Sequence, residues 1–381
     1  MLITSGKTLA ENVSNSYAQI TADFTTPDAA MLTRLTRDVW SFSAAKNYQE
    51  LRDLTLALRD ENGKLREKED YLKEAERICE KFDENWFSTE YDTAISSAQN
   101  AARYAEFDQE ADVITNLRYQ TVGDGNVRAE HALLDGIIRP ANDPFWNKYY
   151  PPNGWNCRCE AVQSLDGFGR VTRESELPKV HIPELFNTNL AKTGCIFPKN
   201  HPYYKGIPKA ELRKALAYLP PENTYLSVTI NKGVNIDIHP WHGDLELDKN
   251  INACRDLNSL DKSAKIKLLP IIEEKDKAAK KLFLPDEYLK KFPLKNPDII
   301  YNNRVGEIEI SNGGKTSIQN AIKHGKKQSD FVLVKVPDGL ELNSVSHIVN
   351  GQMKHYEDKE NLTVWMFNNT GKIEFITKQK R

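Results

Sequence analysis

The sequence has little of what a secreted or membrane-bound protein requires. Its 381 residues include only five cysteines, a sparse and odd number that argues against a disulfide framework and for a reducing compartment. No apolar run reaches the roughly 20 residues of a membrane-spanning helix, so no membrane partner is expected. The first residues, MLITSGKTLA, lack the basic start and apolar core of a secretory signal. With 39% hydrophobic and 28% charged residues and a net charge of −2, the composition is typical of a globular protein of two or three domains.

The most informative stretch is residues 126–159, NVRAEHALLDGIIRPANDPFWNKYYPPNGWNCRC. Its run Pro151-Pro152-Asn153-Gly154 predicts a turn, because Pro fixes φ while Asn and Gly accept positive φ. Cys157 and Cys159 follow, with both thiols on one face if the backbone is extended. Aromatic side chains are expected to pin this loop onto a core. They are Phe145, Trp146, Tyr149, Tyr150 and Trp155.

Several side chains of this stretch are candidate metal ligands. Cys157, Cys159 and His131 carry donors suited to zinc, and Asp135 or Asp143 would complete a set of four. The alternative is that His131 hydrogen-bonds within the loop while the cysteines pack as a pair. A Cys–His nucleophile can also be drawn from these residues, although the aromatic surroundings favour a packed, structural loop. The sequence therefore leaves a structural zinc site open.

This stretch resembles a known family. The order R-x-x-H-x-x-L-D-G, followed by DPFWNKYYPPNGWNCRC, is similar to the head-morphogenesis domain of the phage Mu F-like minor capsid proteins. The resemblance covers roughly residues 30–205. The matching residues are Arg128, His131, Leu134, Asp135, Gly136, Asp143, Pro144, Phe145, Trp146, Tyr149 and residues 151–159.

The resemblance implies a phage or prophage minor head protein that acts in head morphogenesis and in DNA packaging or ejection. It implies a place in the virion, inside the capsid near the portal, and in the bacterial host cytoplasm during assembly and after ejection. The implied partners are the portal, capsid and scaffold proteins and the phage DNA.

The region before this motif has a helical pattern. Hydrophobic residues recur at spacings of three, four or seven, as one apolar stripe requires. They are Tyr48, Leu51, Leu54, Leu58, Leu65, Leu72 and Ile78. Asn62-Gly63 predicts a turn between helices, and a further helix is predicted from Ser88 to Phe107.

The predicted fold class is α+β with several domains. We expect a flexible arm (1–25), a helical region (26–110), a small loop-rich Mu F-like α+β domain (111–205), a linker (206–233) and a small α+β domain with a meander-like sheet (234–381). Strands are predicted over 112–122, 160–170, 234–238, 265–269, 299–301, 305–310, 331–336, 363–367 and 372–376. Helices of the last domain are predicted over 251–260, 315–328 and 343–356.

The last domain also resembles a family. Its runs KNPDIIYNNRVGE and SIQNAIKHGKKQSD are similar to the phage and toxin branch of the barnase–EndoU–colicin–RelE-like RNases, over roughly residues 235–381. The resemblance implies a toxin or effector that cleaves host RNA, tRNA in particular, by metal-independent attack of the ribose 2′-OH. It implies no cofactor and a possible immunity protein as partner. One departure is that Glu309 stands where the family has a Lys after the acid matched by Glu307.

Cleavage of RNA by this chemistry needs a base, an acid and a cation near the phosphate. Glu307 and Glu309 are candidate bases on one face of a strand, and Lys315 is the candidate cation. The other candidates are Thr316 and Ser317 for the phosphate at a helix N-terminus, Lys327 and Gln328 on the same helix, and His324 and His347 as acids. The alternative is a solvated helix face with Ser317 as a cap, on an inactive module that binds nucleic acid or protein.

Overall fold

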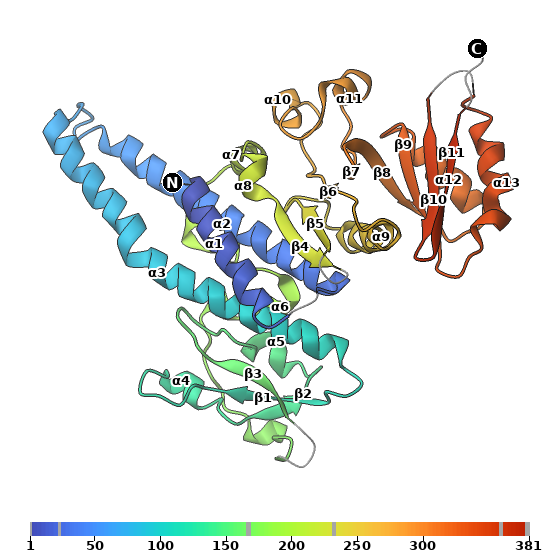
Figure 1. Cartoon of the computed structure of the whole chain (residues 1–381). Coiled ribbons are helices and arrows are strands. Elements are labelled where there is room, and N and C mark those ends of the chain that lie inside the picture. Colours follow the sequence, from blue (N-terminus) through green and yellow to red (C-terminus); the bar gives the residue numbers. More distant parts are fainter. Residues whose placement is uncertain (1, 22–23, 165–168, 231–233, 358–360, 378–381) are drawn as a thin grey trace. The chain divides into compact units, whose positions relative to one another are not determined.

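The computed structural model describes residues 2–21, 24–164, 169–230, 234–357 and 361–377 (Figure 1). The chain divides into two compact units. The first comprises residues 1–22 and 34–216, and the second residues 23–33 and 217–381. Within the described ranges, no helix combines the length and the hydrophobicity of a membrane span.

Three helices dominate the N-terminal third of the chain, namely α1 (Leu2–Ala18), α2 (Thr26–Ala57) and α3 (Lys68–Gln109). The predicted turn at Asn62-Gly63 joins α2 to α3, and Gly63 has φ +78°, which glycine adopts without steric cost. The break expected before Ser88 is wrong, because α3 is one helix of 42 residues. It contains no Pro or Gly to interrupt its hydrogen bonds.

The predicted flexible arm differs most from the structure. It contains α1, which packs against α3. Leu9, Val13 and Tyr17 form a buried stripe at helical spacing among the polar residues. Gly6 approaches the ring of Trp40 so closely that a Cβ there would lie 2.4 Å from it. The polar composition of this segment therefore concealed a packed helix.

The predicted apolar stripe of α2 and α3 is largely exposed. Five leucines, which we call the leucine tip, lie in the last two turns of α2, the connecting turn and the first two turns of α3. They are Leu51, Leu56, Leu58, Leu65 and Leu72, with exposed fractions of 56%, 66%, 42%, 62% and 53%. The buried parts of the helices lie farther from the connecting turn. In α2 they include Leu35 and Trp40, and in α3 the small side chains of Ala94, Ala98 and Ala101 allow close packing.

A three-stranded antiparallel sheet follows α3. Its central strand is β1 (Asn116–Gln120), flanked by β2 (Ile138–Pro140) and β3 (Glu160–Ser164), so the strands predicted before and after the motif are confirmed. The short helices of this unit are α4 (Ala129–Ala132), α5 (Phe145–Tyr149), α6 (Leu190–Thr193) and α7 (Lys209–Ala217). α3 contacts both β3 and α6 and is the support on which the motif loop rests.

The second unit contains an eight-stranded mixed sheet in the order β11-β10-β9-β8-β7-β6-β5-β4. Its strands are β4 (Leu226–Ile230), β5 (Val234–Ile238), β6 (Ile266–Leu268), β7 (Ile299–Tyr301), β8 (Arg304–Ile310), β9 (Phe331–Lys335), β10 (Thr363–Asn368) and β11 (Gly371–Ile376). Its helices are α8 (Pro221–Thr224), α9 (Leu247–Leu260), α10 (Lys277–Lys280), α11 (Asp286–Lys291), α12 (Lys315–Gly325) and α13 (Leu342–Met353).

The sheet is not the predicted meander. Strands β8, β9 and β10 are parallel, because α12 and α13 carry the chain back between them. β4 lies inside the predicted linker, where Leu226, Val228 and Ile230 alternate as buried residues and pair with β5. α12 and α13 cover one face of strands β8–β11, and α9 lies on the other (Figure 1).

Candidate metal centre

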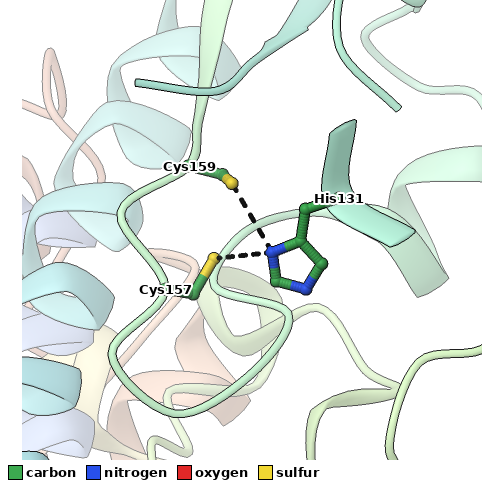
Figure 2. Close-up of side chains that lie close together, drawn as sticks. All are labelled: His131, Cys157 and Cys159. Atoms are coloured by element: carbon green, nitrogen blue, oxygen red, sulfur yellow. Dashed lines mark hydrogen bonds between the residues drawn. The ribbon is translucent and has the colours of Figure 1, made fainter. Parts of the chain in front are cut away.

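His131, Cys157 and Cys159 converge in one buried site (Figure 2). His131 is carried by α4, and the two cysteines directly precede β3. The Nδ1 atom of His131 lies 3.6 Å from the Cys157 Sγ and 3.7 Å from the Cys159 Sγ. The three residues are 4%, 2% and 3% exposed. The structure thus assembles three of the predicted metal donors.

Helix α3 holds the Cys-x-Cys segment by its backbone. The Ser96 hydroxyl donates to the Cys157 carbonyl oxygen over 2.7 Å, and the Asn100 amide donates to the Cys159 carbonyl oxygen over 3.3 Å. Arg158, between the cysteines, is exposed and pairs with Asp124 at 2.8 Å. The two thiols therefore share the inner face, as alternation along an extended backbone predicts.

The turn before the cysteines is fixed by a buried amide. Asn153 is fully buried, accepts a hydrogen bond from the Tyr119 hydroxyl at 2.9 Å, and donates to the carbonyl oxygen of Tyr150 at 3.2 Å. The sequence assigned Asn153 only a turn conformation. The structure instead places the positive φ, 54°, at Asn156. The turn signature thus predicted the position of Asn153 in a turn, but not the hydrogen bonds by which its side chain holds that turn.

The expected aromatic packing of the loop is confirmed. Phe145, Trp146 and Tyr150 are buried. The indole N–H of Trp146 donates to the Pro140 carbonyl oxygen at 2.9 Å, and the Tyr150 hydroxyl donates to the carbonyl oxygen of Asn100 at 2.9 Å. These hydrogen bonds satisfy the polar atoms of the buried rings and make the loop rigid.

The two thiols of the site differ in acidity. The neighbouring Cys159 thiol, together with His131, lowers the pKa of Cys157 against the effect of burial. The same Cys157–Cys159 interaction and burial raise the pKa of Cys159. Cys157 is therefore the sulfur that carries negative charge most readily.

The predicted fourth ligands have other contacts. The Asp135 side chain is exposed and accepts hydrogen bonds from the Thr121 N–H at 2.7 Å and from its hydroxyl at 3.1 Å. Asp143 accepts hydrogen bonds from the Arg139 guanidinium, with a closest distance of 2.6 Å, and from the Phe145 N–H. Neither belongs to the group of donor atoms within 4.8 Å of one another, as far as the described residues extend.

Comparison with known proteins identifies the segment that contains this site. Residues 51–162 match the family model described as Phage Mu protein F like protein. This segment is a Mu F-like domain. It includes the leucine tip, α3 and the three buried donors, and it is shorter at both ends than the resemblance predicted.

Two curated relatives match shorter stretches of the chain. The "Putative capsid assembly protein F" of Escherichia phage Mu is 43% identical over 72 residues, which is 19% of this chain and 16% of that protein. The "Mu-like prophage FluMu F protein" of Haemophilus influenzae is 42% identical over 77 residues, which is 20% of this chain and 18% of that protein. The matches thus span less than a fifth of either relative. No solved structure matches the chain.

Beyond the Mu F-like domain, α12 separates the predicted nuclease residues. Lys315 and Thr316 are exposed at its N-terminal end, whereas Lys327 is exposed just after its C-terminal end. Since a helix of 11 residues is about 16 Å long, these side chains do not form one cluster. The Ser317 hydroxyl accepts hydrogen bonds from the Ser311 hydroxyl at 3.0 Å and the Asn312 N–H at 3.2 Å.

The remaining candidates lie on α12 and α13 or directly after α12. Gln328 is half-buried, and its backbone carbonyl oxygen accepts a hydrogen bond from the Tyr288 hydroxyl at 2.6 Å. His324 on α12 and His347 on α13 are exposed. The hydrogen bonds of Ser317 and Gln328 stabilise the two ends of α12.

The predicted bases lie with a third carboxyl group. The Glu307 carboxylate accepts a hydrogen bond from the Asp298 N–H at 3.2 Å, and Asp298 accepts one from the Ile308 N–H at 3.1 Å. Burial, followed by the carboxyl groups of Asp298 and Glu309, raises the pKa of Glu307. Burial also raises the pKa of Asp298 to about 7 and that of Glu309 to about 7.

Within the part of the chain that the structure describes, the carboxyl groups of Asp298, Glu307 and Glu309 have no basic side chain paired with them. Within the described ranges, no Lys or Arg forms an ion pair with Asp298, Glu307 or Glu309. The sequence did not include Asp298 in the site, although it belongs to the KNPD run that carries the resemblance. Among the described residues Lys315 thus forms no ion pair with Glu307 or Glu309, and their RNase roles stay a prediction.

Proposed function

We propose that the protein acts in phage head morphogenesis as a structural head protein. The observation that carries this proposal is the Mu F-like domain over residues 51–162, with a relative named for capsid assembly. A structural role fits this domain, because its motif residues form a buried, hydrogen-bonded loop. We place the protein in the virion, near the portal, and in the bacterial cytoplasm during assembly.

The leucine tip is the surface that we assign to protein partners. Exposed apolar side chains that gather at one place mark protein-interaction sites. The tip exposes five leucines at the closed end of the α2–α3 hairpin, inside the family match. Portal, capsid or scaffold proteins are the proposed partners, and contact with phage DNA in packaging or ejection belongs to the same proposal.

The test replaces Leu56 and Leu65 by serine in the phage or prophage that encodes the chain. We expect fewer assembled heads and an unchanged unfolding midpoint of the purified protein, because both side chains already face solvent. Leu245→Ser is the matched control, since Leu245 is 94% exposed in the second unit. Normal head numbers with both tip substitutions would exclude the tip as an assembly surface.

For the second unit, an inactive module that binds nucleic acid or protein is the candidate that its geometry supports best. The absence of a basic partner for Glu307 and Glu309 across the described ranges favours this candidate, because RNA cleavage develops negative charge at the phosphate. Glu309 supports the RNase alternative, since a carboxyl group with a pKa of about 7 suits acid–base catalysis at neutral pH. Host RNA, tRNA in particular, and an immunity protein would then be partners.

Incubation of the full-length protein with total bacterial RNA in the presence of a chelator separates these candidates. An RNase would yield discrete fragments that disappear with Glu307→Gln and with Lys315→Ala. Lys354→Ala, which removes an exposed lysine outside the candidate site, is the control. Intact RNA would favour the binding module, because the proposed transesterification needs no metal or other cofactor.

A further inference from the structure

We propose that His131, Cys157 and Cys159 bind one zinc ion, through the imidazole Nδ1 and the two thiolate sulfurs. The site lies in the Mu F-like domain, but the inference is independent of the function proposed for the chain. It is carried by the geometry, the burial and the donor chemistry of these three side chains.

The spacing of the donors fits tetrahedral zinc. Zinc lies about 2.3 Å from sulfur and about 2.0–2.1 Å from nitrogen, so two ligands at a tetrahedral angle are about 3.5–3.6 Å apart. The observed distances from the His131 Nδ1 to the two sulfurs are 3.6 and 3.7 Å. Both distances therefore match the separation of two zinc ligands, and the three donor atoms all lie within 4.8 Å of one another.

Hydrogen bonding alone leaves this arrangement incomplete. Nδ1 of a histidine carries either one proton or one lone pair, so it can form a good hydrogen bond with only one of the two sulfurs. Both sulfurs nevertheless approach the same nitrogen. A zinc ion between the three atoms binds all of them at once.

The surroundings of the donors also favour a metal. The Ser96 hydroxyl and the Asn100 amide of α3 donate hydrogen bonds to the carbonyl groups of the two cysteines. Such outer contacts orient ligands before the ion binds. Sulfur and imidazole donors favour zinc over magnesium or calcium, which prefer oxygen.

Burial favours the metal over a Cys–His nucleophile. All three residues are less than 5% exposed, whereas a nucleophile must reach its substrate. Since Asp135 and Asp143 are engaged by Thr121 and Arg139, the fourth zinc position is assigned to water. The ion would tie the α4 segment to the segment that enters β3.

The metal content of the full-length protein tests the site. The protein is produced in zinc-supplemented medium and purified without chelators, and its zinc is measured by mass spectrometry. We expect one zinc per chain in the wild type and loss of this zinc in Cys157→Ser and Cys159→Ser. Cys79→Ser and Asp135→Asn are the thiol and carboxylate controls, and both should retain the metal.

A second measurement does not depend on the folding of the variants. Wild-type protein is stripped with a chelator and titrated with Zn²⁺ or Co²⁺. Zinc should raise the thermal unfolding midpoint, and cobalt should produce the charge-transfer absorption of a thiolate complex. Wild-type protein that carries only traces of zinc and shows neither response would overturn the proposal. Loss of zinc in Asp135→Asn would overturn the three-residue ligand set.

Discussion

Both units bury carboxyl groups, but they neutralise them by different means. In the first unit, Glu90 is buried and its carboxylate lies 2.7 Å from the Lys46 ammonium group. Burial raises the pKa of Glu90, and the charge of Lys46 opposes this rise. In the second unit, Asp298, Glu307 and Glu309 lie near one another. Burial raises the pKa values of Asp298 and Glu307, and the neighbouring carboxyl groups raise them further.

The Lys46–Glu90 pair and the group of Asp298, Glu307 and Glu309 should therefore respond to different perturbations. An ion pair makes folding depend on both partners and changes little with pH near neutrality. Carboxyl groups neutralised by protons make folding depend on pH instead. The first unit should therefore be sensitive to loss of a lysine, and the second to alkalinity.

The largest effect is expected from Lys46→Met. This change leaves the Glu90 carboxylate buried without its cation, which should lower the free energy of unfolding by about 3–5 kcal/mol. Urea denaturation followed by tryptophan fluorescence measures the loss. The double variant Lys46→Met, Glu90→Gln should recover much of it. An equally unstable double variant would show that packing, not charge, accounts for the loss.

The second prediction concerns pH. The pKa of Asp298 is about 7 in the folded state and about 4 in an unfolded chain, so the folded state holds a proton that the unfolded state loses between these values. The contribution of Asp298 to the free energy of unfolding should therefore fall as pH rises from 4 to 7, by up to about 1.4 kcal/mol per pH unit, and this contribution should level off above pH 7.

A series of urea denaturations from pH 4 to 8 measures this dependence. Asp298→Asn should flatten the curve, because the amide does not titrate. Glu309→Gln should flatten it less, since Glu309 is less buried than Asp298 and its charge is better solvated. A wild-type stability that rises between pH 4 and 7 would contradict neutralisation by protonation.

A smaller loss is expected from Asn153→Ala in the motif turn. The change removes the acceptor of the Tyr119 hydroxyl and the donor to the Tyr150 carbonyl group, both buried. Unpaired buried groups of this kind cost about 1–3 kcal/mol. The matched control is Asn156→Gly, which should be neutral because Asn156 is exposed with φ 54°. Equal effects of the two changes would exclude a special role for Asn153.

The smallest effect is expected from Ser317→Ala in the second unit. The hydroxyl accepts hydrogen bonds from Ser311 and Asn312 before α12, and their loss should cost about 1 kcal/mol in urea denaturation. Thr316→Ala, whose side chain is exposed, should have no measurable effect. If Ser317→Ala leaves the free energy of unfolding unchanged, the Ser317 hydroxyl does not stabilise the start of α12. That result would favour the predicted role of Ser317 in phosphate binding.

Local signals allowed much of the secondary structure to be predicted. The strands at residues 234–238, 299–301 and 331–335 and the helix from Lys315 follow from side-chain periodicity and turn residues, which act over a few positions. The sequence by itself also pointed to three donors of the candidate metal centre, whereas only the structure separated Asp135 and Asp143 from them. His131, Cys157 and Cys159 carry the right chemistry within a motif of rare residues, and the turn keeps the two cysteines together.

Only the tertiary structure decided which of these residues act together. Ser96 and Asn100 support the cysteines from about 60 positions away in the chain, so no local pattern connects them. The length of α12 separates Lys315 from Lys327, although the two residues lie close together in the sequence. Burial and ion pairing depend on the three-dimensional surroundings of a side chain. For the same reason the leucine tip is exposed although its spacing resembles that of a core.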